Sequence, residues 1–210
     1  TIMIGLTKVI KMFLGEVVYK KERKGENNVL VRAIQYSNDD ENFSRIEYNF
    51  KGQVHYTKMI KKLCEFNRRS EFILKVLKDL LEEKVNEQIM ILGHNKNLLK
   101  YLYDAISHRG MATVGYYIGG MKEKDLKISE SKKVIIATYA MAEEGLDIKT
   151  LTTLLMATPR VDVTQAVGRI LRRKHSQANV IDIVDQHPIF ERHWNKRRIF
   201  YTKQKNNILI

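Results

Sequence analysis

Short apolar segments alternate with amphipathic segments between about residue 67 and residue 187. The apolar segments are residues 88–92, 113–117, 133–137, 152–157 and 179–184. The intervening segments repeat apolar residues three or four positions apart, which is the spacing of a helix that buries one face. Parallel strands need long crossover connections, and the helices that provide them cover the sheet on both sides. The alternation therefore predicts an α/β fold, with a parallel sheet and helices on both faces.

The two ends of the chain have a different pattern. The first third predicts a short helix at residues 5–13 and strands at residues 16–19, 29–36 and 43–50. The last part predicts one basic helix from residue 188 to about residue 203. A length of 210 residues suits a single domain with a full core. We expect a β-rich lead-in with a first helix (1–66), a core (67–187) and a basic C-terminal helix (188–210).

The charge balance favours a polyanionic partner. Lys and Arg total 37 against 24 Asp and Glu, which gives a net charge of +13. Nucleic acid is the common partner of such chains, although many basic proteins bind nothing specific. The single cysteine, Cys64, excludes an internal disulfide and fits a reducing, intracellular compartment. No apolar run is long enough to span a membrane, so no membrane partner is expected. The chain starts at Thr1 without a Met, which suggests a piece of a longer protein.

Residues 165–173 carry the strongest local signal for a phosphate site. In a helix, Gln165, Arg169 and Arg172 share one face. The inward-facing residues would be Val167, Ile170 and Leu171. Gly168 costs about 1 kcal/mol relative to alanine inside a helix, so a ligand that approaches closely is one explanation. Guanidinium groups match the geometry of phosphate, but a solvated basic helix face remains the alternative.

Polar residues follow four of the predicted strands. They lie at residues 93–96, 118–120, 138–139 and 158–160. Ligands of open α/β sheets collect at the carboxyl ends of the strands. The sequence therefore predicts one polar rim at this edge.

Two motifs resemble motifs V and VI of superfamily 2 helicases. Motif V corresponds to Ala-Thr at residues 137–138 followed by Gly-Leu-Asp-Ile at residues 145–148, and motif VI to Gln-x-x-Gly-Arg-x-x-Arg at residues 165–172. The resemblance implies a RecA-like fold and an ATP-dependent helicase. Residues 5–9 resemble the end of a first lobe, so this chain would be the second, C-terminal lobe. The front strands and residues 67–69 look most like the XPB- and UvsW-type branch, which includes helicases of large nucleocytoplasmic DNA viruses.

The resemblance implies roles for particular residues. Arg169 and Arg172 would be catalytic arginine fingers on the γ-phosphate. The residues implied in ATP binding are Gln165, Gly145, Asp147, Arg169 and Arg172. The residues implied in nucleic-acid binding are Gly93, His94, Asn95, Lys96, Gly119, Gly120 and Thr138.

Local explanations compete with several of these roles. His94 could be a capping or solvated loop residue, and Asn95 a helix N-cap. Thr138 could satisfy a neighbouring backbone group, and Asp147 could be a turn residue after Gly145. In the C-terminal helix, aromatic residues could stack on bases, but their helical spacing favours packing on the sheet.

Several parts of a helicase are missing from the sequence. It has no Gly-x-x-x-x-Gly-Lys-(Ser/Thr) loop, no Asp-Glu-x-(Asp/His) motif and no metal-ligand spacing. The resemblance then implies that ATP and Mg²⁺ are bound mainly by an N-terminal RecA-like lobe of the same polypeptide, so this chain alone should be inactive. The expected substrate is single-stranded or duplex nucleic acid, with DNA favoured. The alternative is a non-catalytic, basic nucleic-acid-binding module.

Overall fold

The computed structural model describes residues 29–144, 148–170 and 178–210, and a parallel sheet forms its centre. The strands are β1 (Val29–Tyr36), β2 (Gln88–Gly93), β3 (Val114–Tyr117), β4 (Val134–Thr138), β5 (Leu151–Met156), β6 (Ala178–Asp185) and β7 (Asn207–Leu209). Their order in space is β3-β4-β2-β5-β6-β1-β7, and every neighbouring pair is parallel. The predicted parallel sheet is confirmed, and the five predicted core strands differ from the observed ones by one residue at one or both ends.

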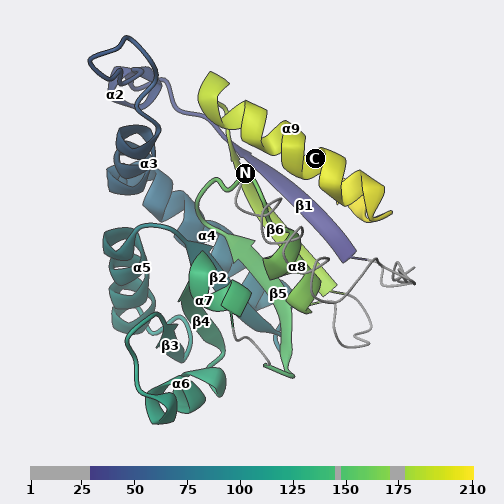
Figure 1. Ribbon diagram of the computed structural model, residues 1–210. Coiled ribbons are helices and arrows are strands. Elements are labelled where there is room, and N and C mark those ends of the chain that lie inside the picture. Colours follow the sequence, from purple (N-terminus) through teal and green to yellow (C-terminus); the bar gives the residue numbers. More distant parts are fainter. Residues whose placement is uncertain (1–28, 145–147, 171–177) are drawn as a thin grey trace, which may run out of the picture.

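Helices cover both faces of this sheet (Figure 1). They are α2 (Glu41–Ser44), α3 (Tyr56–Glu65), α4 (Asn67–Glu83), α5 (Lys96–His108), α6 (Glu123–Glu130), α7 (Tyr139–Glu144), α8 (Thr164–Ile170) and α9 (Pro188–Lys203). Strand β2 shows how the two faces differ. Ile89 and Ile91 join the core under α3, α4 and α5, whereas Met90 and Leu92 join the core under α7, α8 and α9. Because both faces are covered, every residue of β2 is buried.

Strand β1 has the predicted bounds but lies deeper in the fold than a lead-in strand would. It pairs along its whole length with β6, from Val29 opposite Ala178 to Tyr36 opposite Asp185. Its other side pairs with β7 near the C-terminus of the chain. The front segment therefore contributes one strand to the same sheet as the core.

The predicted strand at residues 43–50 is wrong. The short helix α2 begins there because the Asp40 side chain accepts a hydrogen bond from the backbone N–H of Asn42 and caps it. Phe43 is buried in the core instead of alternating along a strand, and only one isolated bridge, between Tyr48 and Val54, follows in this described stretch. The helix predicted at residues 5–13, the strand predicted at 16–19 and the lobe-end resemblance at 5–9 lie outside the described residues.

Helix α9 packs on the sheet through its aromatic residues, as the sequence predicts. Phe190, Trp194 and Tyr201 are buried. Arg197, which the sequence places with the basic residues of this helix, is buried as well, and its guanidinium forms two bonds with the carboxylate of Asp182 on β6, at 2.7 and 2.9 Å. Arg197 is therefore removed from the basic face that could meet a nucleic acid.

A second buried ion pair joins α4 to the end of β6. The guanidinium of Arg69 donates to both carboxylate oxygens of Asp185, and neither side chain is exposed to solvent. A buried ion pair stays favourable only while both partners are present, because each charge has lost its water. The two pairs therefore link the helices of both faces to the same strand.

The described part of the chain gives no sign of a membrane span or of a metal centre. None of its helices is long and apolar enough to cross a bilayer. Its His, Cys, Asp and Glu side chains form no group of three that could hold a metal ion.

Candidate functional site

The strand register places three predicted contact segments in one row. Gly93, the last residue of β2, lies opposite Thr138, the last residue of β4. On the other side of β4, Tyr117 lies opposite Ala137, so the turn that contains Gly119 begins beside Thr138. We call the ends of β2, β4 and β3, with residues 93–96, 138 and 118–120, the strand-end row. It contains three of the four segments of the polar rim that the sequence predicts, and the fourth, residues 158–160, follows β5, the strand next to β2.

Backbone geometry explains two of the three glycines of this row. A side-chain carbon at Gly93 would lie 2.9 Å from a methyl carbon of Leu99, so the entry into α5 has no room for one. Gly120 has a φ of +89°, a conformation that side chains disfavour. Gly119 and Gly120 are exposed, and nothing lies within 4 Å of the position of a Cβ at either residue. The turn after β3 therefore presents an unobstructed backbone.

Two residues of the row have local bonds, as their alternative interpretations predict. The side-chain oxygen of Asn95 accepts from the backbone N–H of Asn97 and of Leu98, at 2.8 and 3.2 Å, and so caps α5. The hydroxyl of Thr138 accepts from the backbone N–H of Met141 at 3.4 Å. Lys96 follows the cap and is exposed.

His94 directs both ring nitrogens into the protein. Its Nε2 lies 3.4 Å from a guanidinium nitrogen of Arg160, which can only donate, so Nε2 is the acceptor. Its Nδ1 then carries the proton and donates to the hydroxyl of Thr158 at 2.9 Å. Although His94 is exposed as a residue, its ring packs 4.7 Å from the ring of Tyr139. The loss of water around the ring, and secondly the charge of Arg160, lower the pKa of His94 to about 4.

The imidazole is thus neutral at physiological pH and has no free donor. These bonds give the ring a local role, while the nucleic-acid contact that the resemblance implies for His94 stays a prediction. In its local role, His94 fixes the loop between β2 and α5 against the end of β5.

Arg160 connects the loop after β5 to its neighbours on both sides. Its guanidinium donates to Glu143 of α7 at 2.8 Å and lies 4.9 Å from the ring centre of Tyr139. Its Nε donates to the backbone carbonyl of Asp162, just before α8, at 2.9 Å. Its own carbonyl accepts from the buried Arg197 of α9 at 2.6 Å. Since Arg160 also contacts His94, this residue bonds to the entry of α5, to α7 and to the entry of α8.

The sequence did not single out Arg160. Its only sequence signal was its place in a polar segment after a predicted strand. Three partners of Arg160 lie far from it along the chain, at residues 94, 143 and 197, so spacing alone could not find them.

Helix α8 presents an exposed polar face. Val163, Ala166 and Val167 are buried, which confirms the inward position of Val167, whereas Gln165 and Gly168 are exposed. Nothing lies within 4 Å of the position that a side chain at Gly168 would take, so packing does not explain this glycine.

Not every predicted nucleotide contact falls within the described residues. Arg169 lies in α8 by its backbone, while Arg172, Gly145 and Asp147 lie outside the described residues, as does Leu171. The structure therefore places the helix that begins motif VI but not its second arginine.

Comparison with known proteins identifies the family. Residues 73–174 match the family described as "Helicase conserved C-terminal domain", a range that begins in α4 and ends after α8. Together with the fold and its neighbours, this match shows that the chain belongs to the superfamily 2 helicases and is a C-terminal RecA-like lobe.

Viral relatives extend the similarity to nearly the whole chain. A protein of Acanthamoeba polyphaga mimivirus, L396, named as a candidate ATP-dependent RNA helicase, is 33% identical over 211 residues, which cover 97% of this chain and 40% of the relative. The protein QP509L of African swine fever virus (strain Badajoz 1971 Vero-adapted), named in the same way, is 26% identical over 95% of this chain and 43% of its own length. This chain therefore spans about two fifths of the length of these relatives.

The solved structure of T4 UvsW has the same fold. It matches with a TM-score of 0.67 and 21% identity, over 88% of this chain and 41% of that chain. The expected α/β fold of a RecA-like lobe is thus confirmed.

Proposed function

We propose that this chain is the second motor lobe of an ATP-dependent superfamily 2 helicase or translocase. The strand-end row carries the proposal, because it gathers the segments implied in nucleic-acid binding at one edge of the sheet. In this proposal, an N-terminal RecA-like lobe of the same polypeptide completes the ATP site and the strand track. Closure of the two lobes on ATP, and opening after hydrolysis, would move the protein along one strand.

The strand-end row suits the backbone of a nucleic acid. Gly119 and Gly120 present exposed main chain without side chains, and Lys96 is an exposed cation at the start of α5. Gly93 is buried, and in this proposal it contributes by letting the chain enter α5 closely packed against Leu99. Helix N-termini and backbone N–H groups favour phosphate and read no base sequence. The net charge of +13 adds a general attraction for a polyanion. His94 and Asn95 contribute by holding the loop in place, and the hydroxyl of Thr138 stays a proposed contact with the strand backbone.

The exposed face of α8 suits a nucleotide shared with the first lobe. Gln165 lies on that face, and the absence of a side chain at Gly168 leaves space for close approach. We assign Arg169 and Arg172 to the γ-phosphate, where they would stabilise charge during hydrolysis. Gly145 and Asp147 would complete this lobe's contacts with ATP, whereas Mg²⁺ would be held mainly by the first lobe.

Arg160 supplies a physical link between the two sites. It contacts His94 beside the strand-end row and the backbone of Asp162 at the start of α8. We propose that this link couples strand binding to the position of α8.

The substrate of the whole protein could be RNA or DNA, and two similarities favour different choices. The viral relatives are named as RNA helicases, whereas the resemblance to the UvsW-type branch favours DNA. The proposed contacts address phosphates, so we propose that the lobe itself binds single strands of either kind.

Binding of single-stranded nucleic acid by this chain should be weak, independent of base sequence and strongly dependent on salt. Counterion release predicts a linear fall of log affinity with log salt concentration, by about 0.7 per phosphate contact on single strands. Fluorescence anisotropy with DNA and RNA strands at several salt concentrations measures this slope. Replacing Lys96 by alanine should reduce this slope by the amount that corresponds to about one phosphate contact. Tight, salt-insensitive or sequence-selective binding would favour the alternative, a non-catalytic nucleic-acid-binding module.

A further inference from the structure

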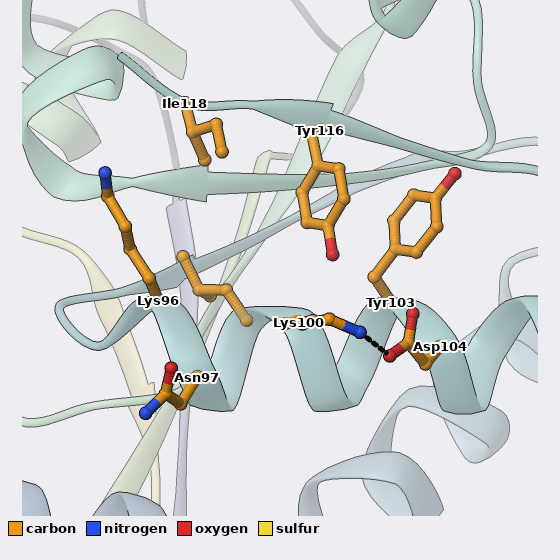
Figure 2. A pocket seen from close by; sticks show the side chains of 8 residues that line it. Lys96, Asn97, Lys100, Tyr103, Asp104, Tyr116 and Ile118 are labelled. Atoms are coloured by element: carbon orange, nitrogen blue, oxygen red, sulfur yellow. Dashed lines mark hydrogen bonds and ion pairs between the residues drawn. The ribbon is translucent and has the colours of Figure 1, made fainter. Parts of the chain in front are cut away.

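A groove opens between α5 and the end of β3, beside the strand-end row. Its volume is about 470 Å³, which lies in the range of small-molecule sites. Lys96, Leu99, Tyr103, Tyr116 and Ile118 are among the residues that line it (Figure 2). The side chains whose bonds hold the strand-end row together, those of His94, Asn95 and Thr138, do not line this groove.

The groove has one aromatic wall. The rings of Tyr103 and Tyr116 are stacked, with their centres 4.1 Å apart and their planes 11° from parallel. In Figure 2, Tyr116 stands between Tyr103 on one side and Ile118 with Lys96 on the other. The second face of the Tyr116 ring is therefore turned toward the side of the groove where the aliphatic side chain of Ile118 lies. A flat aromatic guest would stack on that face and be flanked by apolar carbon.

The charges of the groove favour an anion at its mouth. Lys100 is neutralised by Asp104, with Nζ 2.5 Å from Oδ2. Lys96 is exposed, and no ion pair joins it to any carboxylate in the described ranges. It belongs to the first turn of α5, a helix of 13 residues whose N-terminus carries partial positive charge. The groove thus combines an aromatic face with a single uncompensated cation at one end.

We infer that the groove receives one unpaired nucleobase of the bound strand, while the adjoining phosphate lies at Lys96. The inference rests on the proposed nucleic-acid row and adds a base contact to it. Continuity argues for a nucleobase over the side chain of a protein partner. Ile118 directly precedes Gly119 and Gly120, and Lys96 belongs to both the row and the groove, so a strand on the row passes the groove mouth. Stacking accepts any base, because each has a π-face, so the site adds affinity without sequence readout.

The test compares strands with and without bases on variants of this chain. Tyr116→Leu should weaken binding of a single strand by about 5- to 150-fold, the range expected for loss of one stacked base. The same variant should bind an abasic strand as the unaltered chain does. Tyr116→Phe keeps the ring and should bind both strands normally, whereas Lys96→Ala should weaken both. Anisotropy at one fixed salt concentration gives all these affinities.

A second measurement needs no variant. A strand with one 2-aminopurine between abasic positions should lose fluorescence when it binds the unaltered chain, because the base stacks on Tyr116.

Each contrary result has a definite meaning. The base site would be overturned if Tyr116→Leu bound the strand with bases as tightly as the unaltered chain does, or if it lost the same affinity for the abasic strand. Unchanged 2-aminopurine fluorescence on binding would overturn it as well. If Lys96→Ala still weakened binding in that case, the phosphate row would survive without the groove. Failure of the unaltered chain to bind either strand would overturn both. Binding of an acidic, tryptophan-containing peptide that Tyr116→Leu abolishes, without any effect of the bases, would assign the groove to a protein partner instead.

Discussion

Arg169→Ala or Arg172→Ala, placed in a protein that carries both lobes, should lower the rate of ATP hydrolysis by about 10³- to 10⁵-fold. That is the range known for arginine fingers, and it corresponds to roughly 4 to 7 kcal/mol of transition-state stabilisation. The apolar side of α8, which buries Val163, Ala166 and Val167, is unchanged by either substitution. Folding and nucleic-acid binding should therefore stay close to normal.

Steady-state kinetics separates this role from simple ATP binding. The first lobe would carry the main phosphate site, so kcat should fall far more than KM rises. Lysine at either position should rescue little, because a point charge does not reproduce the planar fork of arginine. Arg173→Ala is the matched control and should have a mild effect. A dead Arg173→Ala protein with near-normal turnover in Arg172→Ala would show that the motif is displaced by one residue.

Asp182→Ala should cost about 3 to 5 kcal/mol of unfolding free energy, the range for removing one partner of a buried ion pair. The substitution leaves the guanidinium of Arg197 buried without its carboxylate, and only 2% of that side chain is exposed. It also removes the oxygen acceptor of the Tyr201 hydroxyl, which then keeps only the sulfur of Met156, at 3.9 Å. Since Arg197 donates to the carbonyl of Arg160, the loop before α8 should become easier to open as well.

Denaturant unfolding of this chain measures the loss, with an exposed pair as control. Lys78 and Glu82 pair across one turn of α4 with two thirds of each side chain exposed, so Glu82→Ala should change stability by less than about 0.5 kcal/mol. Replacing both buried partners, as Asp182→Leu with Arg197→Met, should be less harmful than Asp182→Ala alone, because no unpaired charge remains. A loss below about 1 kcal/mol for Asp182→Ala would show that the pair is not a structural link.

Much of the sheet could be predicted because its strands are short apolar runs between clear helical stripes. The run at residues 29–36 predicts β1 to the residue, since it is rich in β-branched residues. Its position beside β6 could not be predicted, because register between distant strands depends on which faces are left to cover. The failure at residues 43–50 has a local cause, since the cap at Asp40 favours a helix turn over the strand that the aromatic residues indicate.

The candidate site was predictable to the extent that parallel strands bring their ends together. Gly93 and Thr138 meet for that reason alone. The role of His94 was not predictable, because its tautomer is set by Arg160, which lies 66 residues further along the chain. Burial of Arg197 was equally hidden, since a basic residue among basic residues gives no sign of its partner on β6.

Phosphate release from ATP tests most directly whether this chain is half of a motor. The chain alone, with or without single-stranded nucleic acid, should show no turnover, because it has neither a phosphate loop nor the Mg²⁺-binding carboxylates of a first lobe. A longer protein that carries both lobes should hydrolyse ATP, and nucleic acid should stimulate it. Stimulated turnover by this chain alone, persisting through repeated purification and unaffected by Arg169→Ala, would contradict the assignment of a second lobe.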